Sequence, residues 1–215
     1  MKLLKTAVTA LVVSVSISTA QAAPIVLDFE GAGDGARILE FYNGGTDSYG
    51  NFGSSKGVSF GPNALSLTTG NFNDNPSGRT IMFFLSGSAM LNYAAGFTTG
   101  FSFYYSSSTS ALINIWDGLN GTGNLLASLN LAAQSSLNCA NPNTTYCNWT
   151  AVGANFLGTA RSIDFGGGVN AIGYDDITFG SATAGDTGNE VSAPATLGLL
   201  GLAMTGFAFR RRRQA

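Results

Sequence analysis

The chain has 215 residues, ten basic and twelve acidic side chains, a formal net charge of −2 and no histidine. Without histidine, Ser-His-Asp and Cys-His catalytic sites are excluded. All twelve acids but only four of the basic residues lie between Ala23 and Glu190, so this body carries a charge near −8. Such a body is not expected to bind nucleic acid, because phosphate contacts require basic side chains.

The N-terminus has the three parts of a secretory signal peptide, residues 1–22. Lys2 and Lys5 form a positive region, Ala7 to Ile17 an apolar region, and Ala20-Gln21-Ala22 an A-x-A cleavage site. We therefore expect the mature chain to begin at Ala23; a retained N-terminal membrane helix is the alternative. About 165 residues remain once both termini are set aside, a length typical of one domain with its own core.

The body, residues 23–180, has the sequence pattern of an all-β protein. Apolar stretches are short and separated by turn residues, and glycine is abundant, with 29 residues. In Phe101, Phe103 and Tyr105 every second side chain is aromatic, which indicates a strand with one buried face. We expect an antiparallel two-sheet sandwich or jelly roll. The predicted strands are 25–29, 57–60, 64–68, 80–85, 90–93, 99–105, 112–117, 125–130, 149–155, 160–166 and 171–179.

Aromatic and amide side chains occur together in loop-like sequence. The segments 42–51 and 71–75 are favoured as ligand loops, because functional residues concentrate on surface loops of a rigid scaffold. Sugars stack on exposed aromatic rings and form hydrogen bonds with amides, so the composition predicts a carbohydrate ligand. The candidate ligand residues are Tyr42, Asn43, Tyr49 and Trp149. The same composition also fits turns and edge strands.

Cys139 and Cys147 are the only cysteines. In an exported chain they are expected to form one disulfide that closes a small loop, residues 140–146. Metal binding by this pair is disfavoured, because the chain has no histidine and no second cysteine pair.

The two ends of the body resemble those of β-jelly-roll carbohydrate-binding modules. The matching segments are Leu27-Asp28-Phe29-Glu30-Gly31 at the start and Tyr174-Asp175-Asp176-Ile177 at the end. In such modules the first and last strands lie side by side, and acids from both often hold a structural calcium ion. The resemblance implies a Ca²⁺ site formed by Glu30 with Asp175 or Asp176. Carboxylates are suitable calcium ligands; solvated acids at strand ends are the alternative.

Residues 181–191 are small and polar and have no apolar face, which predicts a flexible linker between the body and the C-terminal segment. The segment that follows, 192–215, contains an uncharged run from Ala195 to Phe209 and then Arg210, Arg211, Arg212 and Arg213. A helix of fifteen residues is about 22 Å long, shorter than the ~30 Å hydrocarbon core of a bilayer. The arginines would hold its end on the cytoplasmic side.

This C-terminal arrangement resembles the PEP-CTERM sorting signal of Gram-negative bacteria. That signal has a Pro-Glu-Pro-like tripeptide, an apolar helix and a basic tail; here Ser192, Ala193 and Pro194 stand in place of the tripeptide. The resemblance implies processing near these residues by exosortase, a transpeptidase-like membrane enzyme, after transient membrane insertion. It also implies a secreted or cell-surface location in a polysaccharide-rich matrix. A permanent single-pass anchor is the alternative.

Together these observations predict a non-catalytic surface or matrix protein with polysaccharide as its expected ligand. A purely structural matrix protein, anchored permanently by its C-terminal helix, is the alternative. A glycoside-active enzyme that uses two carboxylates is less favoured, because the sequence does not place two of them at the required ~5 to 10 Å.

Overall fold

The computed structural model describes residues 22–68, 70–140 and 144–188, and within these ranges it contains nine β-strands and no helix. The strands are β1 (Ile25–Leu27), β2 (Val58–Phe60), β3 (Leu65–Leu67), β4 (Ile81–Phe83), β5 (Ala89–Ser107), β6 (Ala111–Trp116), β7 (Leu125–Leu131), β8 (Thr150–Phe165) and β9 (Ile172–Phe179). The predicted all-β fold class is confirmed. None of the described residues forms a helix that could span a membrane. The predicted signal peptide and C-terminal helix lie outside the described ranges, apart from Ala22.

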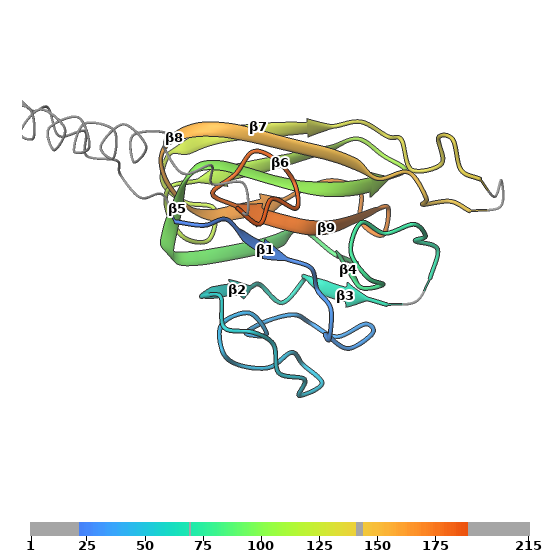
Figure 1. Cartoon of the computed structure of the whole chain (residues 1–215), viewed down its shortest axis with the longest axis horizontal. Coiled ribbons are helices and arrows are strands. Elements are labelled where there is room, and N and C mark those ends of the chain that lie inside the picture. Colours follow the sequence, from blue (N-terminus) through green and yellow to red (C-terminus); the bar gives the residue numbers. More distant parts are fainter. Residues whose placement is uncertain (1–21, 69, 141–143, 189–215) are drawn as a thin grey trace, which may run out of the picture.

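All strand pairs are antiparallel, and hydrogen bonds join the nine strands into one continuous sheet. The long strands β5 and β8 pair with each other along most of their length. The first part of β5 also pairs with β2, and the last part of β8 pairs with β6. The second part of β5 instead pairs with β9. The sheet therefore folds over along β5 and β8 into the two layers of a sandwich (Figure 1).

Strand β5 bends where its pairing with β8 changes register. The register shifts between Asn92 and Phe97 and again between Phe97 and Thr99. Gly96, within this interval, has a φ of 76°, a conformation that glycine adopts at low cost. Irregularities of this kind bend a strand and increase its twist. A single strand can therefore contribute to both layers.

The core between the layers is rich in aromatic rings. Phe165 of β8 lies edge-on to Phe103 of β5, with ring centroids 5.8 Å apart, and to Tyr174 of β9, at 4.8 Å. All three side chains are buried completely. Edge-to-face pairs of this kind add to the stabilisation from burial. The period-two aromatic pattern of the sequence thus corresponds to the inner faces of the two layers.

Residues 28–57, here called the N-lobe, contain no strand and cover one side of the sandwich, at the bottom of Figure 1. Backbone hydrogen bonds attach the N-lobe to the segments around β2 and β3: Phe60 donates to Leu39, and Ser66 donates to Ala36. Ile38 and other apolar side chains of the N-lobe are buried in the main core. The N-lobe is therefore part of the same folded domain.

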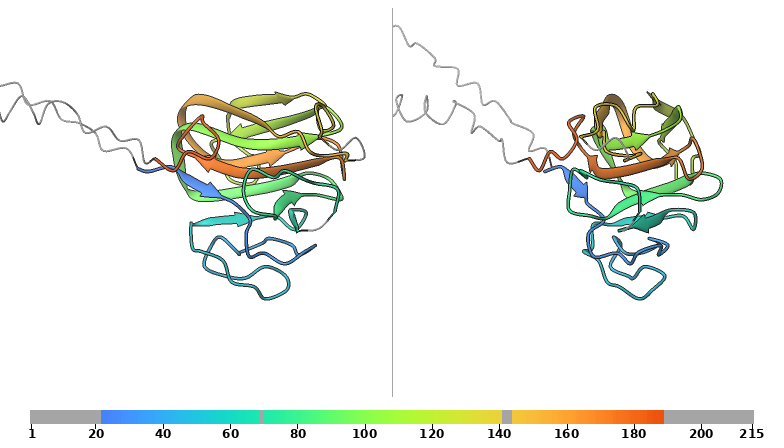
Figure 2. Two further views of the ribbon diagram at one scale, coloured as in Figure 1. Left: turned by 45° about the vertical axis from the view of Figure 1, so that its right-hand side comes forward. Right: turned by 90° about the vertical axis from the view of Figure 1, so that its right-hand side faces the viewer.

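The described chain ends lie together at one end of the sandwich, and the disulfide loop lies at the other (Figures 1 and 2). We call these the tether end, with residues 22–25 and 180–188, and the distal end, with residues 70–79, 139–140 and 144–149. The first and last strands are neighbours, because β1 pairs with the end of β9. The body is thus joined to its C-terminal segment at the end away from the disulfide loop.

Residues 181–188 correct one expectation, because this part of the predicted flexible linker packs on the sandwich. Ser102 Oγ donates to the carbonyl of Ser181, and Gly185 N donates to Thr178 Oγ1. Asp186 fixes the turn itself by accepting from Ser181 Oγ and Gly188 N. We call residues 181–188 the strap. The remaining linker residues, 189–191, lie outside the described ranges.

Candidate functional site

The polar groove at the distal end is the candidate binding site. The groove has a volume of about 320 Å³ and is formed almost entirely by one loop between β3 and β4. Its lining residues are Thr68, Gly70, Phe72, Asn73, Asp74, Asn75, Gly78 and Arg79. Amide, carboxylate, hydroxyl and guanidinium groups beside one aromatic ring form a donor and acceptor set suited to a polyhydroxylated ligand. Of the segment 71–75 favoured by the sequence, residues 72–75 lie in this lining.

An aromatic cluster borders the groove. The rings of Phe72 and Tyr146 stack with centroids 4.4 Å apart, and Trp149 lies 5.9 Å from Phe72 in a tilted arrangement. Trp149 Nε1 donates a 2.9 Å hydrogen bond to the carbonyl of Asn73, and Asn73 N donates a 2.8 Å bond to the carbonyl of Tyr146. These contacts join the groove loop to the disulfide loop. Trp149, a predicted ligand residue, is partly exposed beside the groove.

The disulfide between Cys139 and Cys147 closes the neighbouring loop, with Cα atoms 5.6 Å apart. Cys147 directly follows Tyr146, so the covalent link restrains the chain that carries this ring. The backbone amides of Cys147 and Asn148 both donate to the carbonyl of Ser135, at 3.0 Å each. The loop closed by the disulfide, beside the groove, is therefore held by covalent and hydrogen bonds.

The acids expected to bind calcium form hydrogen bonds with the groove loop. Glu30 Oε1 accepts from the backbone amides of Arg79 and Thr80, both at 2.6 Å. Asp175 accepts from the amide of Ser77 at 2.9 Å and from its hydroxyl at 2.7 Å. These bonds hold the segment that ends the groove loop against the sandwich. The acids thus have an observed structural role independent of a metal.

The acids expected to bind calcium already take part in hydrogen bonds. Among the described residues, no group of three or more acidic or thiol side chains is placed to hold a metal ion. The Asp175 oxygens already accept from Ser77, and one also accepts from Asp176 N. Calcium at Glu30, Asp175 and Asp176 stays a prediction of the sequence.

Asp175 is completely buried next to Asp176, and Asp176 in turn lies near Asp28. Burial raises the pKa of Asp175 to about 7, although hydrogen bonds from Ser77 oppose this effect. Burial also raises the pKa of Asp176, and the charge of Asp28 contributes to that rise. Protonation of Asp175 is therefore coupled to the contact that holds Ser77.

Tyr42 is not a ligand residue, and this corrects the sequence interpretation. Its side chain is only 1% exposed. The hydroxyl donates to Asp28 Oδ1 and accepts from Phe29 N, and burial raises its pKa well above the usual value. The ring packs edge-on against Phe29 and Phe41. Tyr42 therefore organises the core of the N-lobe.

The other two predicted ligand residues of the N-lobe reach the surface. Asn43 is exposed, and its Nδ2 donates to Glu40 Oε2. Tyr49 is 66% exposed, on a loop of the N-lobe, whereas Trp149 belongs to the distal end. The four predicted ligand residues are therefore distributed between the N-lobe and the distal end and do not form one site.

Phe72 and Arg79 are groove residues that the sequence interpretation did not identify. Phe72 stands in the favoured segment 71–75, so its position among asparagines was the available signal. No feature of the sequence points to Arg79, because hydrogen bonds fix its place in the groove. Its backbone amide donates to Glu30, and its carbonyl accepts from Asn75 Nδ2. Arg79 is exposed and belongs to the groove lining.

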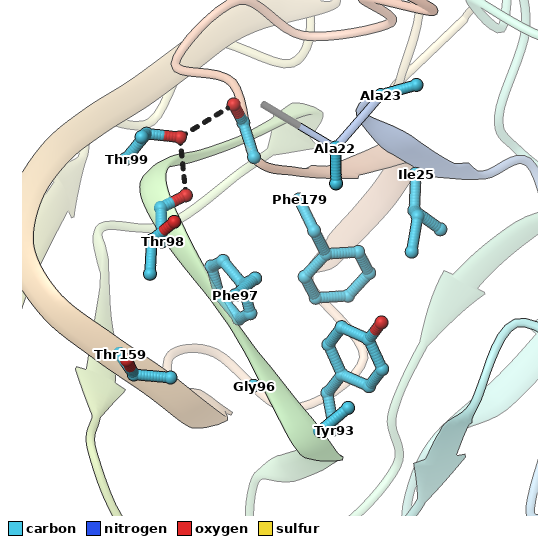
Figure 3. A pocket seen from close by; sticks show the side chains of 12 residues that line it. Ala22, Ala23, Ile25, Tyr93, Gly96, Phe97, Thr98, Thr99, Thr159 and Phe179 are labelled. Atoms are coloured by element: carbon cyan, nitrogen blue, oxygen red, sulfur yellow. Dashed lines mark hydrogen bonds between the residues drawn. The ribbon is translucent and has the colours of Figure 1, made fainter. Parts of the chain in front are cut away.

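A second cavity, of about 300 Å³, lies at the tether end (Figure 3). Tyr93, Phe97 and Phe179 form its aromatic wall, with Phe97 and Phe179 edge-on at 4.9 Å. Ala22 and Ala23, the residues on either side of the predicted signal cleavage, also line it. Cleavage would therefore remove part of its wall, and the distal groove is the better candidate for a ligand site in the mature protein.

Residues 190–213 match the sequence model of the PEP-CTERM protein-sorting motif. The match includes the predicted processing residues Ser192, Ala193 and Pro194 and the tail Arg210 to Arg213, all outside the described ranges. The motif marks a protein that is exported and sorted to the cell surface of Gram-negative bacteria, with exosortase as the processing enzyme. None of the curated proteins compared with the chain is similar in sequence.

Similar solved structures include the K2 cleaved adhesin domain of Lys-gingipain, with a TM-score of 0.45 and 13% identity over 74% of this chain and 100% of that one. The family 6 carbohydrate-binding module CsCBM6-3 from Clostridium stercorarium, solved with cellobiose, has a TM-score of 0.37 and 16% identity over 57% and 86%. A β-1,3-glucan-binding module of the same family from Bacillus halodurans has a TM-score of 0.36 and 15% identity over 58% and 87%. At these scores and identities, the similarity implies no shared ligand.

Proposed function

We propose that the body is a non-catalytic polysaccharide-binding domain, exported and displayed at the cell surface, and that the distal groove is its sugar site. The observation that carries this proposal is the juxtaposition of the polar groove with the cluster of Phe72, Tyr146 and Trp149. The partly exposed rings of Phe72 and Trp149 provide apolar contact area, with the buried ring of Tyr146 stacked on Phe72. The surrounding amides and Arg79 provide directional hydrogen bonds. Such a combination of an apolar surface with a few polar groups is typical of small-ligand sites.

The position of the groove supports the same function. A sugar site at the distal end lies away from the tether end, where the described chain ends at residue 188, ahead of the matched sorting motif. Ligand binding and processing by exosortase therefore need not compete for the same surface. We further propose that processing occurs near Ser192 to Pro194. Mass spectrometry of the exported protein should show a C-terminus lost in this region; an intact Arg210–Arg213 tail would indicate a permanent anchor.

The sugar-binding proposal is tested with the purified body, residues 23–188. Binding is measured to exopolysaccharide from the producing bacterium and to a panel of xylan, β-1,3-glucan, cello-oligosaccharides and alginate. We expect saturable affinity for at least one of them. The variants Asn73→Ala and Arg79→Ala should weaken it, and Arg37→Ala, which removes an exposed arginine of the N-lobe, should not.

Three results would contradict the proposal or part of it. Absence of binding across the whole panel, including the bacterium's own polysaccharide, would favour a purely structural matrix protein. Binding that survives both groove substitutions would mean that sugar is held elsewhere on the body. Release of reducing sugars from a bound polysaccharide would show catalysis and contradict the non-catalytic part of the proposal.

A further inference from the structure

Two aromatic side chains of the N-lobe are strongly exposed. Tyr49 is 66% exposed and Phe52 79%, whereas Phe29, Phe41 and Tyr42 of the same lobe are buried. They are the only aromatic side chains among the strongly exposed large apolar residues of the described chain. Large rings held in water are costly, and clusters of exposed apolar side chains commonly mark interaction sites.

The loop that carries these rings is held by one buried acid. Asp47, only 3% exposed, accepts hydrogen bonds from the amides of Gly33, Tyr49 and Asn51 and from Asn51 Nδ2, all between 2.8 and 3.0 Å. Burial alone would raise the pKa of Asp47, but these bonds outweigh that effect and lower it. Thr46 and Phe52 also form an antiparallel bridge across the loop. The rings therefore stand on a loop ordered before any ligand arrives.

Tyr49 lies over a backbone segment that has no side chain in its way. A Cβ atom at Gly33 would lie 2.8 Å from Tyr49 Cδ2 and 2.9 Å from Asn51 Nδ2, so a larger residue there would displace both side chains. A Cβ atom at Gly35 would lie 3.7 Å from the Tyr49 hydroxyl. The ring thus rests on the Gly33–Gly35 backbone while two thirds of its side chain stays open to solvent.

A fixed ring supported on one side and open on the other suits stacking against the C–H face of a pyranose. Preorganisation favours such binding, because little loop entropy is lost when the ligand stacks. The exposed amides of Asn43 and Asn51 on the same lobe can bond to sugar hydroxyls. Polysaccharide chemistry fits this segment better than a purely apolar partner, since residues 44–55 consist of glycine and polar residues apart from the two rings.

From this geometry we infer that Tyr49 and Phe52 form a second sugar-binding platform, so that one molecule binds two polysaccharide chains and cross-links them. This inference rests on the proposed function of the distal groove. The platform and the groove share no residue. In Figure 1 the N-lobe lies at the bottom and the distal end at the right, and the N-lobe meets the groove lining where Asp34 Oδ1 accepts a hydrogen bond from Thr68 N. Two separate sites on one rigid domain make the protein a cross-linker of the surface matrix.

The experiment uses the purified body and the bacterium's own exopolysaccharide, both intact and hydrolysed to short oligosaccharides. Calorimetry with the oligosaccharides counts sites, and turbidity with the intact polymer reports cross-linking. Fluorescence of Trp149, measured in a Trp116→Phe background because the chain has two tryptophans, reports the groove separately, since Trp149 lies beside the groove. We expect two sites per molecule for the parent protein, and turbidity that peaks near equivalence.

The variant Tyr49→Ala/Phe52→Ala should fold, because both side chains are largely exposed; an unchanged melting temperature checks this. We expect one remaining site, an unchanged Trp149 titration and loss of turbidity. Leu157→Ala, which removes a 92% exposed apolar side chain of β8, is the matched control and should behave like the parent. Tyr49→Phe keeps the ring and should retain both sites.

Two outcomes separate the inference from the proposed function. A single site in the parent protein, with turbidity and stoichiometry unaffected by Tyr49→Ala/Phe52→Ala, would overturn the platform and leave the groove intact. Loss of the Trp149 response in the parent, with binding that depends on Tyr49 and Phe52 alone, would overturn the groove and the cross-linking. If the parent binds no polysaccharide at all, both fail.

Discussion

Trp149 Nε1 donates a hydrogen bond of 2.9 Å to the backbone carbonyl of Asn73, a residue 76 positions earlier in the chain. This bond joins the start of β8 to the groove loop, beside the stacked rings of Phe72 and Tyr146. The indole therefore has two functions at the candidate site, since its ring borders the groove and its N–H fixes one wall.

Replacing Trp149 separates these two functions. Trp149→Phe keeps an aromatic ring beside Phe72 but leaves the Asn73 carbonyl without this donor. We expect a loss of about 1 kcal/mol in the free energy of unfolding, typical of one hydrogen bond, and weaker sugar binding as the loop loosens. Trp149→Ala should weaken binding further. Urea unfolding and binding to the polysaccharide panel measure the two effects; equal affinity in all three proteins would exclude Trp149 from the site.

Removing the disulfide should destabilise the domain and loosen the groove. The bond joins residues eight positions apart, for which the chain-entropy estimate is roughly 2.5 kcal/mol. For a domain of this length we expect Cys139→Ser/Cys147→Ser to lower the melting temperature by roughly 5 to 10 °C. Reduction of the parent protein should give the same shift, and reduction of the double variant none. A stable but non-binding double variant would mean that the bond mainly shapes the groove.

Stability should fall as the pH rises through neutrality. Burial raises the pKa of Asp175 from 3.8 to about 7, so between these values the folded protein holds a proton that the unfolded chain has released. This contribution is complete below about pH 4 and is lost as the pH rises through about 7. We expect a lower melting temperature at pH 8 than at pH 5, measured by differential scanning calorimetry.

Asp175→Asn should flatten this pH dependence, because an amide remains neutral throughout the range and can still bond to Ser77. Glu40→Gln, at an exposed carboxylate, is the control and should leave the profile unchanged. A profile that falls equally steeply in Asp175→Asn would assign the effect to other groups, of which Asp176 is the nearest with a raised pKa.

The strap should open when Asp186 is removed. Asp186→Ala takes away the acceptor for Ser181 Oγ, at 2.7 Å, and for Gly188 N, at 2.8 Å. We expect faster amide hydrogen exchange confined to residues 181–188, with little change in the melting temperature. Asp186→Asn keeps one acceptor oxygen and should be intermediate. Exchange in Asp186→Ala as slow as in the parent would show that packing alone holds the strap.

Glu30 should stabilise the domain through the groove loop. Glu30→Ala removes the acceptor of two backbone amides and should cost about 1–3 kcal/mol; Glu30→Gln keeps an acceptor oxygen and should cost less. The predicted calcium ion is tested on the parent protein in the same assay. A bound ion requires that EDTA lower the melting temperature and that added Ca²⁺ restore it; a constant melting temperature would count against the calcium prediction.

The strands were largely predictable, because period-two alternation survives wherever one face of a strand is buried. The prediction failed on how the strands join. Segments 90–93 and 99–105 are parts of one strand, β5, and 149–155 and 160–166 are parts of β8. Around Gly96 and Gly158, both with positive φ, the alternation breaks as it does at a turn. Only the pairing of β5 with β8 shows that the chain continues.

The candidate site was harder to predict, because burial and position distinguish side chains that look equivalent in sequence. Tyr42 and Tyr49 both stand among glycines and asparagines, yet one is 1% and the other 66% exposed. The difference arises from partners distant in sequence, since the Tyr42 hydroxyl donates a hydrogen bond to Asp28. Likewise, the bond from Ser77 to Asp175 spans 98 positions. No local pattern encodes such contacts.

The placement of β9 has a mechanical consequence. Asp175, early in β9, holds the groove loop through Ser77, and the other end of β9 continues through Gly180 into the strap. A pull between bound polysaccharide and an anchored C-terminus would therefore run along β9. Because β9 is hydrogen-bonded to β5 on one side and to β1 and β4 on the other, the load would shear many bonds at once. The sheet would therefore resist tension applied between the groove loop and the strap.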